Sequence, residues 1–145
     1  MNILLKSAKI VSPGNSVLHL KKRDILVKKG IIEKIATSLP TPSNTKVVAH
    51  KNLHVSIGWL DTSVCFGEPG HEERENIKNG LQVAAQSGFA HIILNPNTDP
   101  IPDTSSDIVF LKERGKSMGC RLHPLGSLTK NSSGMDLAEL YDMHN

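Results

Sequence analysis

From residue 53 onward, strand-like apolar runs alternate with segments of helical periodicity, and this rhythm restricts the possible folds more than any other feature. The run from Phe89 to Pro96 (FAHIILNP) is almost continuously apolar, as in a parallel strand covered on both faces. Just before it, Ile77, Leu81 and Ala84 recur at helical spacing. Because parallel strands need a crossover connection, usually a helix, the alternation predicts right-handed βαβ units and a parallel sheet.

Three such units are expected in residues 53–145. Strands are predicted over 55–64 (VSIGWLDTSV), 89–96 and 121–129 (RLHPLGSLT), and helices over 71–88, Ser106–Ser117 and 135–144. The N-cap of the second helix is expected at Thr104, Ser105 or Ser106. Three units cannot close a barrel of eight, so we expect the chain to be the N-terminal part of a longer protein or a truncated gene product.

Residues 1–52 differ in character, because they consist of short predicted strands joined by turn signals such as Pro13-Gly14 and Lys29-Gly30. The strands are predicted over Ile3–Val11, Asp24–Lys28, Ile31–Ala36 and Lys46–His50. We therefore predict two domains: a small β-unit over 1–52 that is incomplete alone, and an α/β unit over 53–145.

The charge is unevenly distributed: residues 1–52 hold ten Lys or Arg and two acidic residues, whereas residues 53–145 hold seven and twelve. The basic segment contains no Phe, Tyr or Trp for base stacking, so we expect no nucleic-acid binding and expect it to face acidic surface elsewhere in the same protein. No window is apolar enough to span a membrane, and no signal peptide is apparent, which predicts a cytoplasmic protein. Cys65 and Cys120 are expected to be reduced, unrelated thiols.

The most informative motif for chemistry is IGWLDTSVCFGEPG, over residues 57–70. In a β-strand, residues two apart point to the same side, so Asp61, Ser63 and Cys65 are expected to share one face. A strand carrying Asp-x-His-x-His there would aim two imidazoles at one dication. This chain offers a hydroxyl and a thiol instead, so the groups that bind a metal and activate water are missing from this strand.

The chain resembles the cyclic amidohydrolases of the amidohydrolase superfamily, and most closely the dihydroorotases. The resemblance rests on DILVKKGIIEKI, VSIGWLDTSVCFGEPG, NGLQVAAQSGF, LNPNTDPIPDTSSD and LGSLTKNSSGMDLAEL. It implies the N-terminal part of a β-sandwich followed by the first three βα units of a (β/α)8 barrel. It also implies a hydrolase that opens a cyclic amide C–N bond with a zinc-bound hydroxide, interconverting dihydroorotate and carbamoyl-aspartate in pyrimidine biosynthesis.

The resemblance assigns roles to particular residues. The family's Asp-x-His-x-His falls on Asp61, Ser63 and Cys65, so both metal-binding histidines are replaced. The arginine of Phe-Arg-Glu-Pro-Gly, which clamps the substrate carboxylate, is Gly67 here, in the sequence from Phe66 to Gly70. The asparagine of Pro-Asn-Thr remains as Asn97, the candidate for substrate binding, although an asparagine there also suits a turn. The family's later ligands fall beyond residue 145.

These replacements predict an impaired catalytic site. Serine is a poor zinc ligand, and one thiolate without neighbours is no metal site. Even the loss of groups that only orient metal ligands costs about 10–100-fold in affinity or activity. We therefore expect no cofactor in this chain, and leave open whether the protein is an enzyme.

Three functional interpretations stay open at this point. The first is a working cyclic amidase that takes its ligands from elsewhere. The second is a non-catalytic structural or regulatory partner of a carbamoyltransferase, and the third is a fragment without independent stability. The expected partners are the remainder of the barrel, a carbamoyltransferase or a second copy of the chain.

The remaining polar residues have structural interpretations. The seven histidines show no sequence spacing that points to a metal, because the His50 and His54 pair flanks a predicted turn rather than lying on one helix. His123 is expected to be a satisfied core histidine. Asp61 is expected to accept a backbone hydrogen bond, and Glu72, Glu73 and Glu75 to form a solvated helix start.

Overall fold

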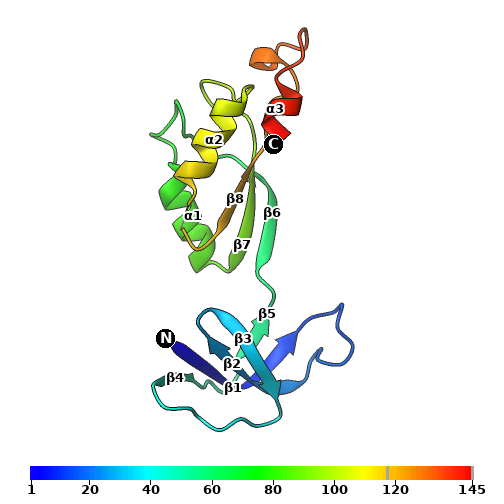
Figure 1. Cartoon of the computed structure of the whole chain (residues 1–145), viewed down its shortest axis with the longest axis vertical. Helices are drawn as coiled ribbons and strands as arrows, with labels where there is room; N and C mark the ends of the chain where they lie inside the picture. Colours follow the sequence, from blue (N-terminus) through cyan, green and yellow to red (C-terminus); the bar gives the residue numbers. More distant parts are fainter. Residues whose placement is uncertain (117, 145) are drawn as a thin grey trace. The chain divides into compact units, whose positions relative to one another are not determined.

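The computed structural model describes residues 1–116 and 118–144. Within them the chain forms two compact units, Met1–Ile57 and a second unit that begins at Gly58 (Figure 1). The sequence placed the boundary at residues 52 and 53, several residues earlier. The difference arises at the strand predicted over 55–64, which is described below.

The first unit is a five-stranded sheet in the order β3-β2-β1-β4, with β5 also paired to β1. Its strands are β1 (Asn2–Val11), β2 (Lys22–Lys28), β3 (Ile31–Ala36), β4 (Thr45–Val48) and β5 (His54–Ser56). β1 pairs antiparallel with β2 and parallel with both β4 and β5. The four strands predicted in this region are confirmed, with ends that differ by up to two residues.

The prediction of one strand over 55–64 is wrong. The segment is divided between β5, which pairs with β1 in the first sheet, and β6 (Trp59–Val64), which pairs with β7 in the second. Ile57 and Gly58 lie between the two strands and belong to neither. The sequence of residues 55–64 does not reveal that its two halves pair with strands of different sheets.

A buried carboxylate fastens the first unit. Asp24 on β2 is 1% exposed, and its oxygens accept hydrogen bonds from the ammonium of Lys6 and from the backbone N–H groups of Ser7 and Leu39, the latter two at 2.9 Å. Burial by itself would raise the pKa of Asp24, but these donors outweigh it and hold the pKa below the ordinary value. The carboxylate thereby connects β1, β2 and the segment after β3.

We expect Asp24→Asn to lower the free energy of unfolding by about 1–3 kcal/mol at neutral pH, because the variant lacks the charged acceptor. Since the folded pKa of Asp24 lies below the unfolded value of about 3.9, wild type loses this contribution as pH falls through that range. The deficit of the variant should therefore shrink below about pH 4. Urea titrations at several pH values measure it. Glu33→Gln, at an exposed ion pair with Lys28, is the control and should have little effect at any pH.

The second unit is a parallel sheet covered by helices, as predicted. Its strand order is β6-β7-β8, with β7 at Phe89–Leu94 and β8 at Arg121–Pro124. Helices α1 (Ile77–Gln86) and α2 (Ser105–Arg114) lie on the same side of this sheet (Figure 1). Between sheet and helices lies a core of buried side chains: Ile77, Leu81, Ala84, Ile92, Leu94, Leu111, Cys120 and Leu122.

The helices begin and end where capping groups permit. The side chain of Asn76 accepts from the N–H of Asn79 at 2.8 Å and starts α1, so the helix predicted over 71–88 begins six residues too early. Thr104, one of the three proposed N-caps, starts α2 in a reciprocal capping box with Asp107. α2 ends at Arg114, earlier than predicted, and the predicted end at Ser117 lies outside the described residues.

The predictions after residue 120 are correct in type and wrong in extent. β8 stops at Pro124, so the predicted strand over 121–129 is too long, although the N–H of Leu125 still donates to the carbonyl of Leu94 at 2.9 Å. A short 3-10 helix (Lys130–Ser132) follows, and the last helix, α3, covers only Leu140–His144. Its predicted first half instead includes a β-bridge between Thr129 and Leu137.

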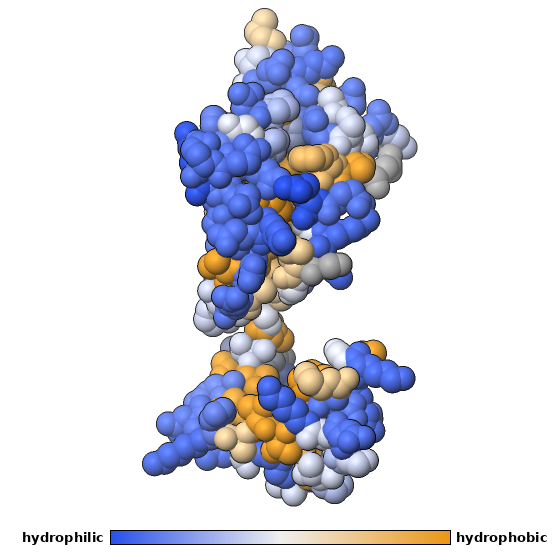
Figure 2. Space-filling view, turned by 90° about the vertical axis from the view of Figure 1, so that its left-hand side faces the viewer, coloured by the Kyte–Doolittle hydropathy of each residue, from blue (hydrophilic) through white to orange (hydrophobic). Residues whose placement is uncertain are grey.

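Large apolar side chains reach the surface of both units, as the face drawn in Figure 2 shows. They include Ile31, Ile32 and Val47 in the first unit, and Trp59, Leu60, Leu125 and Leu128 in the second. Among the described residues, no helix has the length and apolar character needed to cross a bilayer.

Candidate functional site

A small polar cluster lies where β6 and β7 end. Ser63 is on β6, Cys65 follows that strand, and Asn95 follows β7 directly. The Asn95 amide Nδ2 donates to Ser63 Oγ at 3.0 Å and to Cys65 Sγ at 3.5 Å. The carboxyl ends of parallel strands meet at one edge, which is where ligands bind in open α/β sheets and in barrels.

Asp61 stands apart from this cluster. Its Oδ1 accepts a hydrogen bond from the backbone N–H of Ser63 at 3.1 Å, a contact to the backbone as predicted. The pairing register between β6 and β7 shifts between Asp61 and Val64, so strict alternation along β6 is interrupted. The structure thus unites Ser63 and Cys65 through Asn95, a residue that the sequence analysis did not select.

These donors do not fit a zinc ion. Zinc is bound by thiolate, imidazole and carboxylate, whereas Ser63 offers a hydroxyl, and the Cys65 sulfur accepts from the amide of Asn95. Among the residues that the structure describes, His, Cys, Asp and Glu side chains form no group of three or more that could hold a metal ion. We therefore assign no metal-dependent step to Ser63 and Cys65.

The loop after the cluster is closed around a glycine. Gly67 N–H donates to the carbonyl of Glu75 at 2.8 Å, and His71 N–H donates to the carbonyl of Gly67 at 2.8 Å. A Cβ atom at residue 67 would lie 1.9 Å from the carbonyl oxygen of His71, which is backbone and has little room to move. Any side chain at this position, the family's arginine included, requires a different course of the loop.

We expect Gly67→Ala to lower the free energy of unfolding by about 1–3 kcal/mol, because the new methyl group collides with the His71 carbonyl. Gly14→Ala is the matched control, since a Cβ there meets nothing within 4 Å, and it should stay within about 0.5 kcal/mol of wild type. Thermal and urea unfolding compare the two. Equal stability of both variants would show that the loop is not closed in this way.

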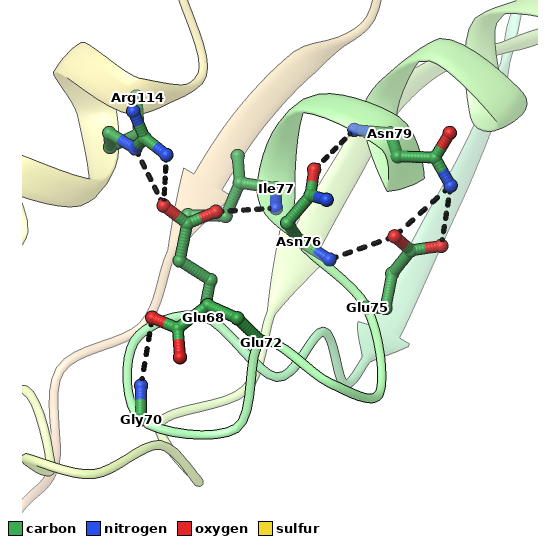
Figure 3. A network of polar contacts seen from close by, with 8 residues as sticks. All are labelled: Glu68, Gly70, Glu72, Glu75, Asn76, Ile77, Asn79 and Arg114. Atoms are coloured by element: carbon green, nitrogen blue, oxygen red, sulfur yellow. Dashed lines mark hydrogen bonds and ion pairs between the residues drawn. The ribbon is translucent and has the colours of Figure 1, made fainter.

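Glu68 is the hub of the polar network drawn in Figure 3. It is 4% exposed, and its Oε1 accepts from Arg114 through Nε at 2.6 Å and Nη2 at 2.5 Å. Its Oε2 accepts from the backbone N–H of Ile77, the first residue of α1, at 2.8 Å. One carboxylate therefore satisfies a free N–H of α1 and binds the last residue of α2.

The sequence predicted that Glu72, Glu73 and Glu75 form a solvated helix start. Glu72 and Glu73 are exposed, but all three lie on the loop before α1 rather than in the helix. Glu75 accepts from the N–H of Asn76 at 2.8 Å and from the Asn79 side chain (Figure 3). Glu72 accepts from the N–H of Gly70 at 3.1 Å. Backbone hydrogen bonds at Glu72 itself and at Gly70 lower the pKa of this carboxyl.

Removal of Arg114 should destabilise the second unit more than removal of Glu68. Arg114→Ala leaves the buried Glu68 carboxylate without its cation, so we expect a loss of about 3–5 kcal/mol. Glu68→Ala removes the buried charge and leaves one buried N–H without its acceptor, while the half-exposed Arg114 side chain is solvated, so we expect a loss of about 1–3 kcal/mol. A double-mutant cycle measured by urea unfolding isolates their coupling. Additive losses would show that the ion pair contributes nothing.

Asn97, the candidate for substrate binding, is exposed on the loop after β7. The loop around it is well held: the Thr98 hydroxyl donates to the carbonyl of Pro100 at 2.9 Å, and the N–H of Asp99 donates to the carbonyl of Pro69 at 3.0 Å. Asn97 therefore follows the same sheet edge as Asn95, and its contact with a substrate stays a prediction.

A histidine pair was not found by sequence reasoning. His91 on β7 and His123 on β8 stack with ring centroids 5.2 Å apart, and His91 Nδ1 lies 2.9 Å from His123 Nε2. Desolvation, with the nearby His91 and Arg121, lowers the pKa of His123. His123 is exposed, so its prediction as a core histidine is wrong: the side chains that alternate with it, such as Leu122, face the helices instead.

No protein-family profile matches the chain. It is, however, 32% identical to the dihydroorotase of Carboxydothermus hydrogenoformans over 143 residues, which cover 99% of this chain and 33% of that protein. It is 36% identical to the dihydroorotase of Desulforapulum autotrophicum over 147 residues, covering 99% and 34%. This chain is an N-terminal homologue of the dihydroorotases. It spans about one third of the length of the curated relatives it matches.

Solved structures confirm the fold of this dihydroorotase homologue. The L-hydantoinase (dihydropyrimidinase) of Arthrobacter aurescens matches 88% of the chain, and 28% of its own, with a TM-score of 0.71 and 19% identity. A dihydroorotase crystal structure matches 90% of the chain, and 32% of its own, with a TM-score of 0.63 and 18% identity. The predicted amidohydrolase architecture, with the first part of an α/β barrel after a β-unit, is thereby confirmed.

Proposed function

We propose that this chain belongs to a dihydroorotase-like amidohydrolase homologue of the cytoplasm whose hydrolytic site is impaired. The proposal is carried by the hydrogen bonds from Asn95 to Ser63 and Cys65, at the two positions where the resemblance places metal-binding imidazoles. A hydroxyl and a thiol held by an amide cannot supply a zinc-bound hydroxide, whose formation depends on a metal that lowers the pKa of water.

A second, independent change supports the same proposal. The resemblance places the substrate-clamping arginine at residue 67, where the loop leaves no room for a Cβ atom. Arginine binds a carboxylate with two parallel hydrogen bonds and a positive charge. Backbone N–H groups supply no such charge. Metal binding and substrate binding are thus both altered, and reversal of one change leaves the other in place.

The alternative is a non-catalytic role as a structural or regulatory partner of a carbamoyltransferase. It is favoured by the contrast between the altered site and the intact interior, in which Ile77, Leu81 and Leu94 remain at most 1% exposed. A protein retained for its fold alone needs such a core and has no need of a metal site.

The experiment measures retained zinc and turnover on the purified, unmodified protein. After dialysis against a chelator, we expect less than stoichiometric zinc and no cyclisation of carbamoyl-aspartate. The dihydroorotase of Geobacter sulfurreducens, which is 33% identical over 144 residues, serves as the positive control in the same assay. Stoichiometric zinc that is retained through dialysis by the unmodified protein but lost from Ser63→Ala combined with Cys65→Ala, or measurable turnover in the unmodified protein, would overturn the proposal.

A further inference from the structure

We propose that His91 and His123 form a binding site for a borderline divalent transition-metal cation, separate from the cluster at Ser63 and Cys65. The facing nitrogens, His91 Nδ1 and His123 Nε2, are 2.9 Å apart, and the rings are inclined by only 25°. Two imidazole lone pairs can therefore be directed at one point between adjacent strands.

The backbone holds this pair in place. In the parallel ladder of β7 and β8, His91 is paired with Arg121, and Ile93 with His123, so the two histidines are diagonal neighbours. The residues that follow His91 and precede His123, Ile92 and Leu122, are 2% and 8% exposed in the core beneath the helices. Both strands are thus anchored from the opposite face, and the imidazoles are positioned before any ligand arrives.

The contact between the two imidazoles suits a metal ion bound by two histidines. In the neutral pair, one nitrogen donates a proton and the other accepts it; a cation that replaces this proton uses both lone pairs. Zinc–nitrogen bonds of about 2.0–2.1 Å in a tetrahedral site place two nitrogens roughly 3.3 Å apart. The nitrogens must move apart by about 0.4 Å, and the rings must also turn, because nitrogens that face each other along a hydrogen bond do not direct their lone pairs at the tetrahedral angle. Water would fill the remaining positions.

The surroundings select the kind of cation. His91 lines a cleft of about 480 Å³ together with Lys112, Lys116 and Arg121, so a cation held by charge alone is repelled. Zn²⁺, Ni²⁺ and Cu²⁺ bind imidazole strongly, whereas Mg²⁺ and Ca²⁺ prefer oxygen.

The test is calorimetric titration of the unmodified chain with Ni²⁺ at pH 7.5. We expect one saturable site in the micromolar range, and no binding of Mg²⁺ under the same conditions. His91→Asn and His123→Asn should each weaken the nickel affinity at least tenfold, because each removes one of two ligands. His54→Asn removes an exposed imidazole in the first unit and should leave the affinity unchanged.

Two further measurements make the result decisive. Ser63→Ala combined with Cys65→Ala should bind Ni²⁺ like wild type; a loss of binding there would place the cation at the family position and overturn this proposal. The proposed function is judged separately, by turnover of carbamoyl-aspartate in the unmodified protein. Ni²⁺ should also protect His91 and His123 of the unmodified chain from carbethoxylation, read by mass spectrometry, which requires no folded variant. Unchanged nickel affinity in both histidine variants, equal weakening in His54→Asn, or equal binding of Mg²⁺ would also overturn it.

Discussion

The second unit depends on the burial of one carboxylate. Glu68 is withdrawn from water, and a buried charge is tolerated only when its oxygens are fully engaged. Its partners are the first N–H of α1 and the guanidinium at the end of α2, so two helices that pack on one sheet are fixed to the loop that leaves β6. The tight course of that loop at Gly67 follows directly before this anchor.

This anchor changes the meaning of the Glu-Pro-Gly motif. In the resemblance the motif marks an amidohydrolase site, yet in this chain the glutamate contacts backbone and arginine rather than an open pocket. Its retention is explained by the packing of α1 and α2, whether or not catalysis survives. Ser63 and Cys65, in contrast, lie at the sheet edge and are not members of the buried core. Within a few residues of each other, Glu68 keeps a structural role, whereas Ser63 and Cys65 no longer provide metal ligands.

The sequence predicted those features that depend on periodicity and local capping. The parallel strands, both long helices and the cap at Thr104 follow from alternating or helical spacing and from a side chain next to its own N–H groups. It failed where partners are distant: β5 pairs with a strand more than forty residues earlier, and Arg114 lies 46 residues from Glu68. Nothing local in the segment after Leu53 distinguishes a strand of the first sheet from one of the second.

The same limitation explains the polar residues that were missed. His91 and His123 have no meaningful spacing along the chain, and they meet only because the β7–β8 register makes them diagonal neighbours. Once that register is known, strict alternation places both rings on the face opposite Ile92 and Leu122. On β6 the register shifts between Asp61 and Val64: the side chains of Ser63 and Cys65 contact Asn95, whereas the Asp61 carboxylate accepts from the backbone N–H of Ser63. Alternation therefore locates functional side chains reliably only along an unbroken ladder.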